Sequence, residues 1–124
     1  MRDRCRLKVL VVEDGWLVAE VLCDSIEEHG GHVIGVAESP GRAFELMVEF
    51  RPDVVLMDVQ LKGGKDGIRF ADAIRLLFGT PVVFCTGDGD WRTLERIRRL
   101  RCELLLKPVQ PAELAFTILK ACGQ

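Results

Sequence analysis

The fold of this chain is decided by the stretch Val54-Val55-Leu56-Met57-Asp58, four apolar residues that end on a carboxylate. Arg51-Pro52-Asp53 precedes it and the Gly-rich segment 62–67 follows it. A short apolar run between turn residues is typical of a strand that is buried on both faces and opens into a loop. Ligands of open parallel sheets bind outside the carboxyl ends of the strands, so Asp58 is a candidate functional residue. A lone Asp at such a place is also typical of a helix cap or a turn.

Strand-like and helix-like segments alternate along the rest of the chain. Further strands are predicted over 7–12, 32–37, 81–85 and 104–106, and helices over 16–28, 40–50, 67–78, 88–100 and from Pro111 onward. The inner face of the helix over 40–50 is expected to include Phe50, and that of the helix over 67–78 to include Leu77. Five strands and five helices predict one domain over 1–124, a three-layer α/β fold with a central parallel sheet. In the common strand order 2-1-3-4-5, the first and third strands are neighbours.

Composition excludes several classes of protein. The 124 residues are 48% hydrophobic and 29% charged, with a net charge of -2, which favours neither nucleic acid nor an anionic membrane as partner. The apolar run after the basic N-terminus stops at Glu13-Asp14, too early for a signal peptide, and no stretch approaches the roughly 18 apolar residues of a membrane span. A cytoplasmic protein is expected. The five cysteines show no C-x-x-C spacing, so reduced thiols are expected rather than disulfides or a zinc site.

Polar residues follow four of the five predicted strands. Glu13-Asp14 come after the first, Asp58 ends the third, Thr86 follows the fourth and Lys107 follows the fifth. All project from one edge of a parallel sheet, where crowded carboxylates would suit Mg²⁺. A fixed positive charge and a hydroxyl beside a nucleophilic carboxylate suit phosphoryl transfer. Taken singly, the acidic pair and Thr86 could be helix caps, and Lys107 a solvated strand end.

Together these motifs resemble the receiver domains of two-component response regulators. The resemblance covers essentially the whole chain and rests on an ordered set: Val11-Val12-Glu13-Asp14, Pro52-Asp53-Val54-Val55-Leu56-Met57-Asp58, Asp66-Gly67, Pro81-Val82-Val83-Phe84-Cys85-Thr86-Gly87 and Leu106-Lys107-Pro108. It implies a flavodoxin-like fold with strand order 2-1-3-4-5. It also implies Mg²⁺-dependent transfer of a phosphoryl group from a histidine kinase or phosphotransfer protein, followed by slow self-dephosphorylation.

The resemblance implies a Mg²⁺ site at Glu13, Asp14, Asp58 and Gln60. Asp14 would bind the ion directly, Glu13 largely through water, and Gln60 through its backbone carbonyl.

It further implies that Asp58 accepts the phosphoryl group, that Thr86 and Lys107 bind its oxygens, and that Gly87 leaves room for the donor. Such a protein is not an enzyme in the usual sense, because it catalyses only its own phosphorylation and dephosphorylation. With no residues left for an output domain, we expect a stand-alone receiver that acts through protein contacts.

Three positions depart from the family pattern. Gly15 follows the acidic pair where the family often has another acid, and Lys62 stands where the loop usually has proline. Leu104, three residues before Lys107, replaces the usual Tyr or Phe that moves inward with the Thr. The phosphorylation chemistry is expected to survive, whereas the route by which it is reported stays open. The alternative is a receiver-like interaction module that works without phosphorylation.

Two rival functions belong to other classes. A small hydrolase could use Asp58 on external phosphate esters, but no second general acid is evident nearby. A flavodoxin is weaker still, because acids stand where a phosphate cradle needs Gly, Ser or Thr.

Arginines crowd the helix predicted over 88–100 and its exit: Arg92, Arg96, Arg98, Arg99 and Arg101. One interpretation is a solvated face with local ion pairs. The other is a docking face, formed with the fifth strand and last helix, for an acidic surface of a downstream target or of a second copy in a homodimer.

Overall fold

The structure, a computed structural model, describes residues 6–61, 65–87 and 90–123. Its centre is a parallel sheet of β1 (Lys8–Val12), β2 (His32–Ala37), β3 (Val54–Asp58), β6 (Val82–Thr86) and β7 (Glu103–Leu106). The strand order is β2-β1-β3-β6-β7. Counted in chain order, these five strands lie in the predicted order 2-1-3-4-5, so the predicted flavodoxin-like α/β fold is confirmed.

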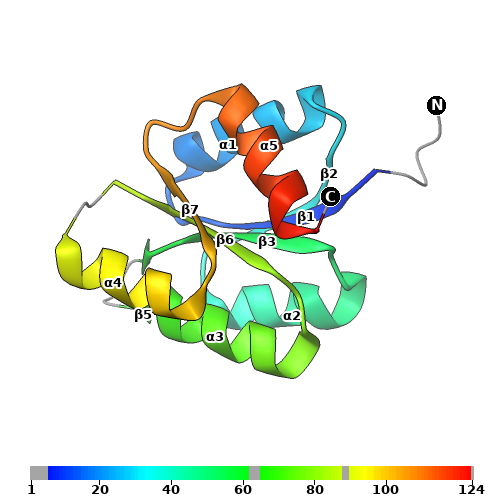
Figure 1. Cartoon of the computed structure of the whole chain (residues 1–124). Helices are drawn as coiled ribbons and strands as arrows, with labels where there is room; N and C mark the ends of the chain where they lie inside the picture. The colour runs from blue at the N-terminus through cyan, green and yellow to red at the C-terminus, as the bar shows by residue number, and fades with distance from the viewer. Residues whose placement is uncertain (1–5, 62–64, 88–89, 124) are drawn as a thin grey trace.

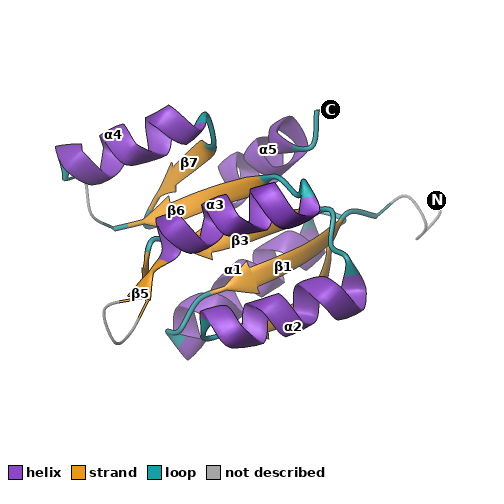
Figure 2. Cartoon of the chain, turned by 90° about the horizontal axis from the view of Figure 1, so that it is seen from below, coloured by secondary structure: helices purple, strands orange, loops and turns teal. Residues whose placement is uncertain are grey.

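Helices cover both faces of the sheet. Helices α1 (Trp16–Glu28) and α5 (Pro111–Ala121) lie on one face, and α2 (Pro40–Phe50), α3 (Gly67–Phe78) and α4 (Trp91–Leu100) on the other (Figure 1). Figure 2 looks onto the second face, with α2 and α3 in front of the strands. Because helices cover both faces, every residue of β3 and β6 is buried, which explains their continuous apolar runs.

Local signals set the helix boundaries. Ser39 caps α2, its hydroxyl oxygen accepting the Arg42 N–H at 3.2 Å, and Pro40 takes the first helical position. Gly79 ends α3 with φ of 69°, a left-handed conformation that glycine adopts without steric cost. Not every apolar position in the predicted stripes is buried: Phe50 and Leu77 are 39% and 68% exposed, because each lies in the last turn of its helix, where the surface faces solvent.

Two features differ from the sequence-based expectation. The loop after β3 contains a short antiparallel hairpin of β4 (Gln60–Leu61) and β5 (Lys65–Asp66), whose two-residue strands carry no readable periodicity. Helix α4 begins at Trp91 with Asp90 as its cap, later than predicted. Positions 62–64 of the predicted loop and 88–89 of the predicted helix lie outside the described residues.

The strand register aligns the carboxyl ends of the sheet. Met57 lies opposite Val12 of β1, and Asp58 lies opposite Cys85 of β6. Thr86 in turn lies opposite Leu106, the last residue of β7. The residues that follow or end these strands are therefore brought to one edge. Within the described ranges, no helix is both long and apolar enough to cross a bilayer.

Candidate functional site

Three carboxylates meet at the carboxyl edge of the sheet. Glu13 and Asp14 follow β1 and Asp58 ends β3, and one oxygen from each lies within 4.8 Å of the others. Glu13 and Asp58 are buried and Asp14 is half-buried. Like charges at this spacing in a partly desolvated site repel strongly, so the cluster needs a compensating cation.

Lys107 supplies one positive charge to this cluster. Its Nζ lies 2.9 Å from Glu13 Oε1 and 3.7 Å from Asp58 Oδ1. The ammonium is therefore closer to Glu13 than to Asp58, the residue beside which the sequence predicted it. Burial tends to lower the pKa of Lys107, but the hydrogen bond to Glu13 and the charge of Asp58 outweigh it, and the pKa is raised. The ammonium therefore stays protonated and tethered between the two carboxylates.

The ionisation of Asp58 is hindered in the folded protein. Burial, reinforced by the charge of Glu13, raises the pKa of Asp58 from 3.8 to about 6. Lys107 and the Gln60 N–H, which donates to Asp58 Oδ1 at 3.2 Å, oppose this rise without cancelling it. One ammonium thus does not neutralise the site.

A magnesium ion fits this donor set. Mg²⁺ prefers oxygen ligands, and carboxylates are common among them. One carboxylate oxygen each from Glu13, Asp14 and Asp58 lies within 4.8 Å of the others, so the three residues could hold one ion together. The cation would also relieve the repulsion that raises the pKa of Asp58.

Thr86 and Gln60 lie beside Asp58. Thr86 is buried at the end of β6, one residue beyond Cys85, the register partner of Asp58. The Gln60 side chain is exposed and its backbone faces the site through the bond to Asp58. Gly87 follows Thr86 at an exposed position. The structure thus gathers every residue that the sequence predicted at this edge, while their separate chemical roles stay predictions.

The N-caps of α1 and α4 are not the polar residues at the strand ends. Helix α1 is capped by Gly15, without a side-chain bond, and the Gly15 N–H instead donates to Glu13 Oε2 at 3.1 Å. Helix α4 is capped by Asp90, whose carboxylate accepts the Arg92 N–H at 3.0 Å. The N-cap positions of these two helices are therefore occupied by Gly15 and Asp90, and not by the acidic pair or Thr86.

Gly67 is a site residue that sequence reasoning treated only as a helix start and as part of a family motif. Its N–H donates to Val59 O at 3.0 Å. A Cβ at this position would collide with the backbone carbonyl oxygen of Asp58 and would lie 2.9 Å from Val59 O. Only glycine allows α3 to begin this close to the strand end that carries Asp58.

The arginines of α4 are mostly engaged in ion pairs. Arg98 and Arg99 contact Glu95 on the same helix at 2.7 and 3.5 Å. Arg96 contacts Asp66 Oδ2 at 2.6 Å, at the end of the β4–β5 hairpin. The interpretation as a face with local ion pairs is therefore confirmed for these three, and Arg96 also reaches beyond its own helix.

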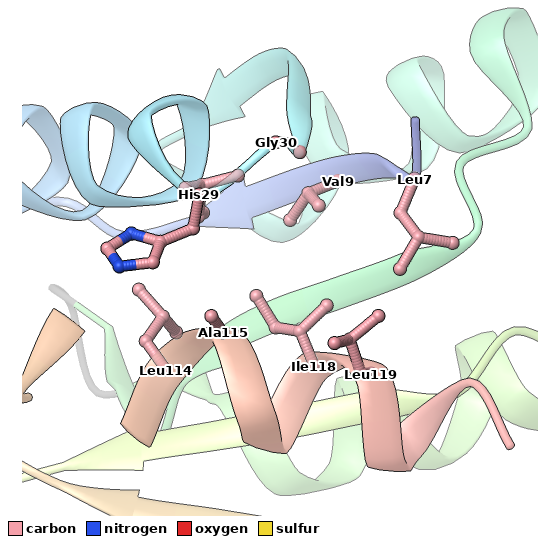
Figure 3. Close-up of a pocket in the computed structure, with 10 residues that line it drawn as sticks. Leu7, Val9, His29, Gly30, Leu114, Ala115, Ile118 and Leu119 are labelled. Carbon is pink, nitrogen blue, oxygen red and sulfur yellow. The ribbon is translucent and has the colours of Figure 1, made fainter. Parts of the chain in front are cut away.

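The surface also has hollows that are not lined by the acidic cluster. A groove of about 500 Å³ runs beside Lys107 and is lined by Leu17, Val18, Val21, Leu22, Pro108 and Val109. A smaller cavity of about 120 Å³ separates the end of α1 from α5, and His29 stands at its edge over Leu114 and Ala115 (Figure 3). The small cavity has an apolar lining without a carboxylate, so it is not suited to phosphoryl chemistry.

Comparison with known proteins gives a consistent assignment. The family model of the response regulator receiver domain matches residues 9–119. The phyllosphere-induced regulator PhyR of Methylorubrum extorquens is 34% identical over 92% of this chain and 43% of its own length. The DNA-binding response regulator MtrA of Mycobacterium bovis is 30% identical over 94% of this chain and 50% of its own length. The chain thus spans half or less of these two relatives.

Solved structures agree. The signal receiver domain of a modulated diguanylate cyclase from Desulfovibrio desulfuricans has a TM-score of 0.87 at 33% identity, covering 95% of this chain and 94% of that one. PhyR from Brucella abortus has a TM-score of 0.81 at 27% identity, covering 95% of this chain and 48% of that one. With the matched segment spanning the sheet, the helices and the acidic edge, the chain belongs to the response regulator receiver domain family.

Proposed function

We propose that the chain is a phosphoacceptor signalling domain in which Asp58 receives a phosphoryl group in a Mg²⁺-dependent reaction. The observation that carries this proposal is the position of Asp58, a buried carboxylate that lies beside the Glu13-Asp14 pair and 3.7 Å from the Lys107 ammonium. The donor is a histidine kinase or a phosphotransfer protein. The chain acts in the cytoplasm as a signalling module rather than as an enzyme on external substrates.

In the transfer, an Asp58 carboxylate oxygen forms a bond to phosphorus while the P–N bond of a phosphohistidine breaks. The imidazole nitrogen keeps the electron pair and takes up a proton. Glu13, Asp14, Asp58 and the Gln60 carbonyl would hold Mg²⁺, which would supply positive charge to the phosphoryl oxygens. Lys107 forms an ion pair with another phosphoryl oxygen once phosphorylation has changed the charge at Asp58.

Thr86 contributes its hydroxyl to the same phosphoryl group. Its place at the end of β6, beside the strand that carries Asp58, supports this role. Water attack on the aspartyl phosphate later returns phosphate and the free carboxylate, which gives slow self-dephosphorylation.

The donor docks on the apolar groove beside Lys107. Leu17 and Val21 of α1 are 59% and 60% exposed, so these apolar side chains are not used for packing α1 on its own sheet. Exposed apolar side chains next to a reactive site are typical of a protein interface. A helix of the donor seated there would bring its histidine toward Lys107 and Asp58.

A downstream partner, or a second copy in a homodimer, contacts the α4–β7–α5 face. Trp91, Leu106 and Phe116 expose 71%, 54% and 68% of their surface on these elements. Arg92 stacks over Trp91 with 5.5 Å between its guanidinium carbon and the ring centroid, so the face combines apolar anchors with positive charge. With Arg92 and Arg99 at its edge, an acidic partner surface is favoured.

The alternative is a receiver-like module that binds its partner without phosphorylation. It is favoured by Leu104, which is half-buried and packs against the core cluster that contains Phe84 and Ile97. Because this packing holds Leu104 in place, its side chain cannot make the inward movement that the aromatic residue makes in other receivers. Unchanged partner binding by Asp58→Asn would support this alternative.

The decisive experiment is incubation with a small acyl phosphate and Mg²⁺, followed by intact mass measurement. We expect one added phosphoryl group that requires Mg²⁺ and is absent from Asp58→Asn. Asp53→Asn, just before the other end of β3, is the matched control and should be labelled like the parent. Labelling that persists in Asp58→Asn would refute the assignment, and repeated turnover of an aryl phosphate would instead support a hydrolase.

A further inference from the structure

The hairpin that follows Asp58 links the acidic site to the start of α3. In the antiparallel register of β4 and β5, Gln60 lies opposite Asp66. The Gln60 N–H donates to Asp58 Oδ1 at 3.2 Å. The residue proposed to offer its carbonyl to the cation is thus paired directly with the residue that caps α3.

The two carboxylate oxygens of Asp66 have different partners. Oδ1 accepts the N–H groups of Ile68 and Arg69 at 2.9 and 3.4 Å, which caps α3. Oδ2 accepts from Arg96 of α4 at 2.6 Å. One oxygen of Asp66 thus caps α3, while the other ties the same residue to α4.

The backbone next to Asp66 is in tight contact with the strand end. The Gly67 N–H donates to Val59 O at 3.0 Å, and there is no room for a Cβ between Gly67 and Asp58 O. A displacement of the Asp66-Gly67 backbone is therefore transmitted to Asp58 and Val59. Both pictures place β5 and α4 at the same end of the molecule (Figures 1 and 2).

We propose that Arg96 is a positioning residue: its ion pair with Asp66 holds the β4–β5 hairpin, and with it the backbone from Asp58 to Gln60, in the arrangement that binds the divalent cation. The inference rests on the proposed function, since the cation is the Mg²⁺ of phosphoryl transfer. By reciprocity, cation binding or phosphorylation at Asp58 strengthens the Arg96–Asp66 pair and biases α4. This gives a route from the site to α4 that does not pass through Leu104.

The expected effect is modest because the pair is partly exposed. The side chains of Arg96 and Asp66 are 48% and 31% exposed, and pairs of this kind are weakened by solvent and salt. We expect loss of the arginine charge to weaken Mg²⁺ binding by about two- to fivefold.

The test measures Mg²⁺ binding to the whole chain by calorimetry in the parent, Arg96→Met and Arg96→Lys. Methionine keeps most of the apolar stem, whereas lysine restores a point charge that can meet a single carboxylate oxygen. Arg98→Met is the matched control, because Arg98 pairs with Glu95 within α4. We expect weaker Mg²⁺ binding only in Arg96→Met, recovery in Arg96→Lys, and faster amide hydrogen exchange at Gly67 in Arg96→Met.

Unchanged Mg²⁺ affinity in Arg96→Met, or an equal loss in Arg98→Met, overturns the inference. Intact mass after treatment with an acyl phosphate separates this failure from failure of the proposed function. A parent that binds Mg²⁺ but takes up no phosphoryl group overturns the proposed function, while the calorimetric comparison still decides the role of Arg96. A parent that does not bind Mg²⁺ overturns both.

Discussion

Replacing Asp58 with asparagine should stabilise the cation-free protein at neutral pH. Burial and the charge of Glu13 raise the pKa of Asp58 from 3.8 to about 6, so folding disfavours the ionised carboxylate. Asparagine is nearly the same size, cannot ionise, and can still accept the Gln60 N–H. The substitution removes the cost of ionisation and keeps the local contact.

The magnitude follows from that pKa. A rise in the pKa from 3.8 to about 6 means that the ionised carboxylate lowers the free energy of unfolding by at most about 3 kcal/mol, at about 1.4 kcal/mol per tenfold change in ionisation constant. Asp14 of the same cluster is half-buried, so solvent reaches the site and screens the charges, and about 1 to 2 kcal/mol is expected. Because the folded state holds the proton more tightly, the cost is absent below pH 3.8, grows as pH rises, and is complete above about pH 6.

The assay is urea unfolding in the presence of a chelator, at about pH 4 and about pH 7.5, with linear extrapolation to water. Asp58→Asn should exceed the parent in free energy of unfolding at the higher pH and match it within about 0.5 kcal/mol at the lower. Saturating Mg²⁺ should shrink the difference, because it binds and stabilises the folded parent. Asp24→Asn, an exposed carboxylate on α1, is the control and should change little.

Two results would refute the reasoning. One is a less stable Asp58→Asn at about pH 7.5 without Mg²⁺. The other is a gain of the same size at both pH values, which would mean that the ionisation of Asp58 is not what destabilises the folded site.

Two further predictions concern neighbouring residues. Gly67→Ala should lower the free energy of unfolding, measured in urea, by more than about 2 kcal/mol, because its Cβ collides with Asp58 O. The control Gly41→Ala, in open space on α2, should raise the free energy of unfolding by about 0.5 to 1 kcal/mol. Equal effects of the two substitutions would contradict the close approach at Gly67. Lys107→Met should lower the free energy of unfolding without Mg²⁺ by about 2 kcal/mol, because it leaves Glu13 beside an unneutralised Asp58. Urea unfolding with Mg²⁺ should show a smaller loss, and a loss that Mg²⁺ does not reduce would argue against charge compensation.

Much of the fold could be predicted because its signals are local. The apolar run over 54–58 is buried on both faces, the Ser39-Pro40 pair starts α2, and Gly79 ends α3. Each of these depends on neighbours in sequence, through backbone conformation and burial. The β4–β5 hairpin escaped prediction because strands of two residues have no periodicity.

The candidate site could be predicted only as a set of strand ends. The sequence places carboxylates after β1 and β3, a threonine at the end of β6 and a lysine after β7, and parallel strands bring such residues to one edge. Which of them touch is a matter of tertiary geometry. Only the structure shows that Lys107 lies nearer to Glu13 than to Asp58, and that burial there hinders ionisation of Asp58.

By itself, then, the sequence determined the α/β class, the strand ends that carry polar groups and the family resemblance, because these follow from residue types and short-range spacing. The tertiary structure decided the contacts between distant segments: Gly67 against the Asp58 backbone, and Arg96 of α4 on Asp66. Those contacts join residues up to 30 positions apart, and their distances depend on how whole helices pack on the sheet. No local pattern encodes that packing, which is why the link from the acidic site to α4 appears only in the folded chain.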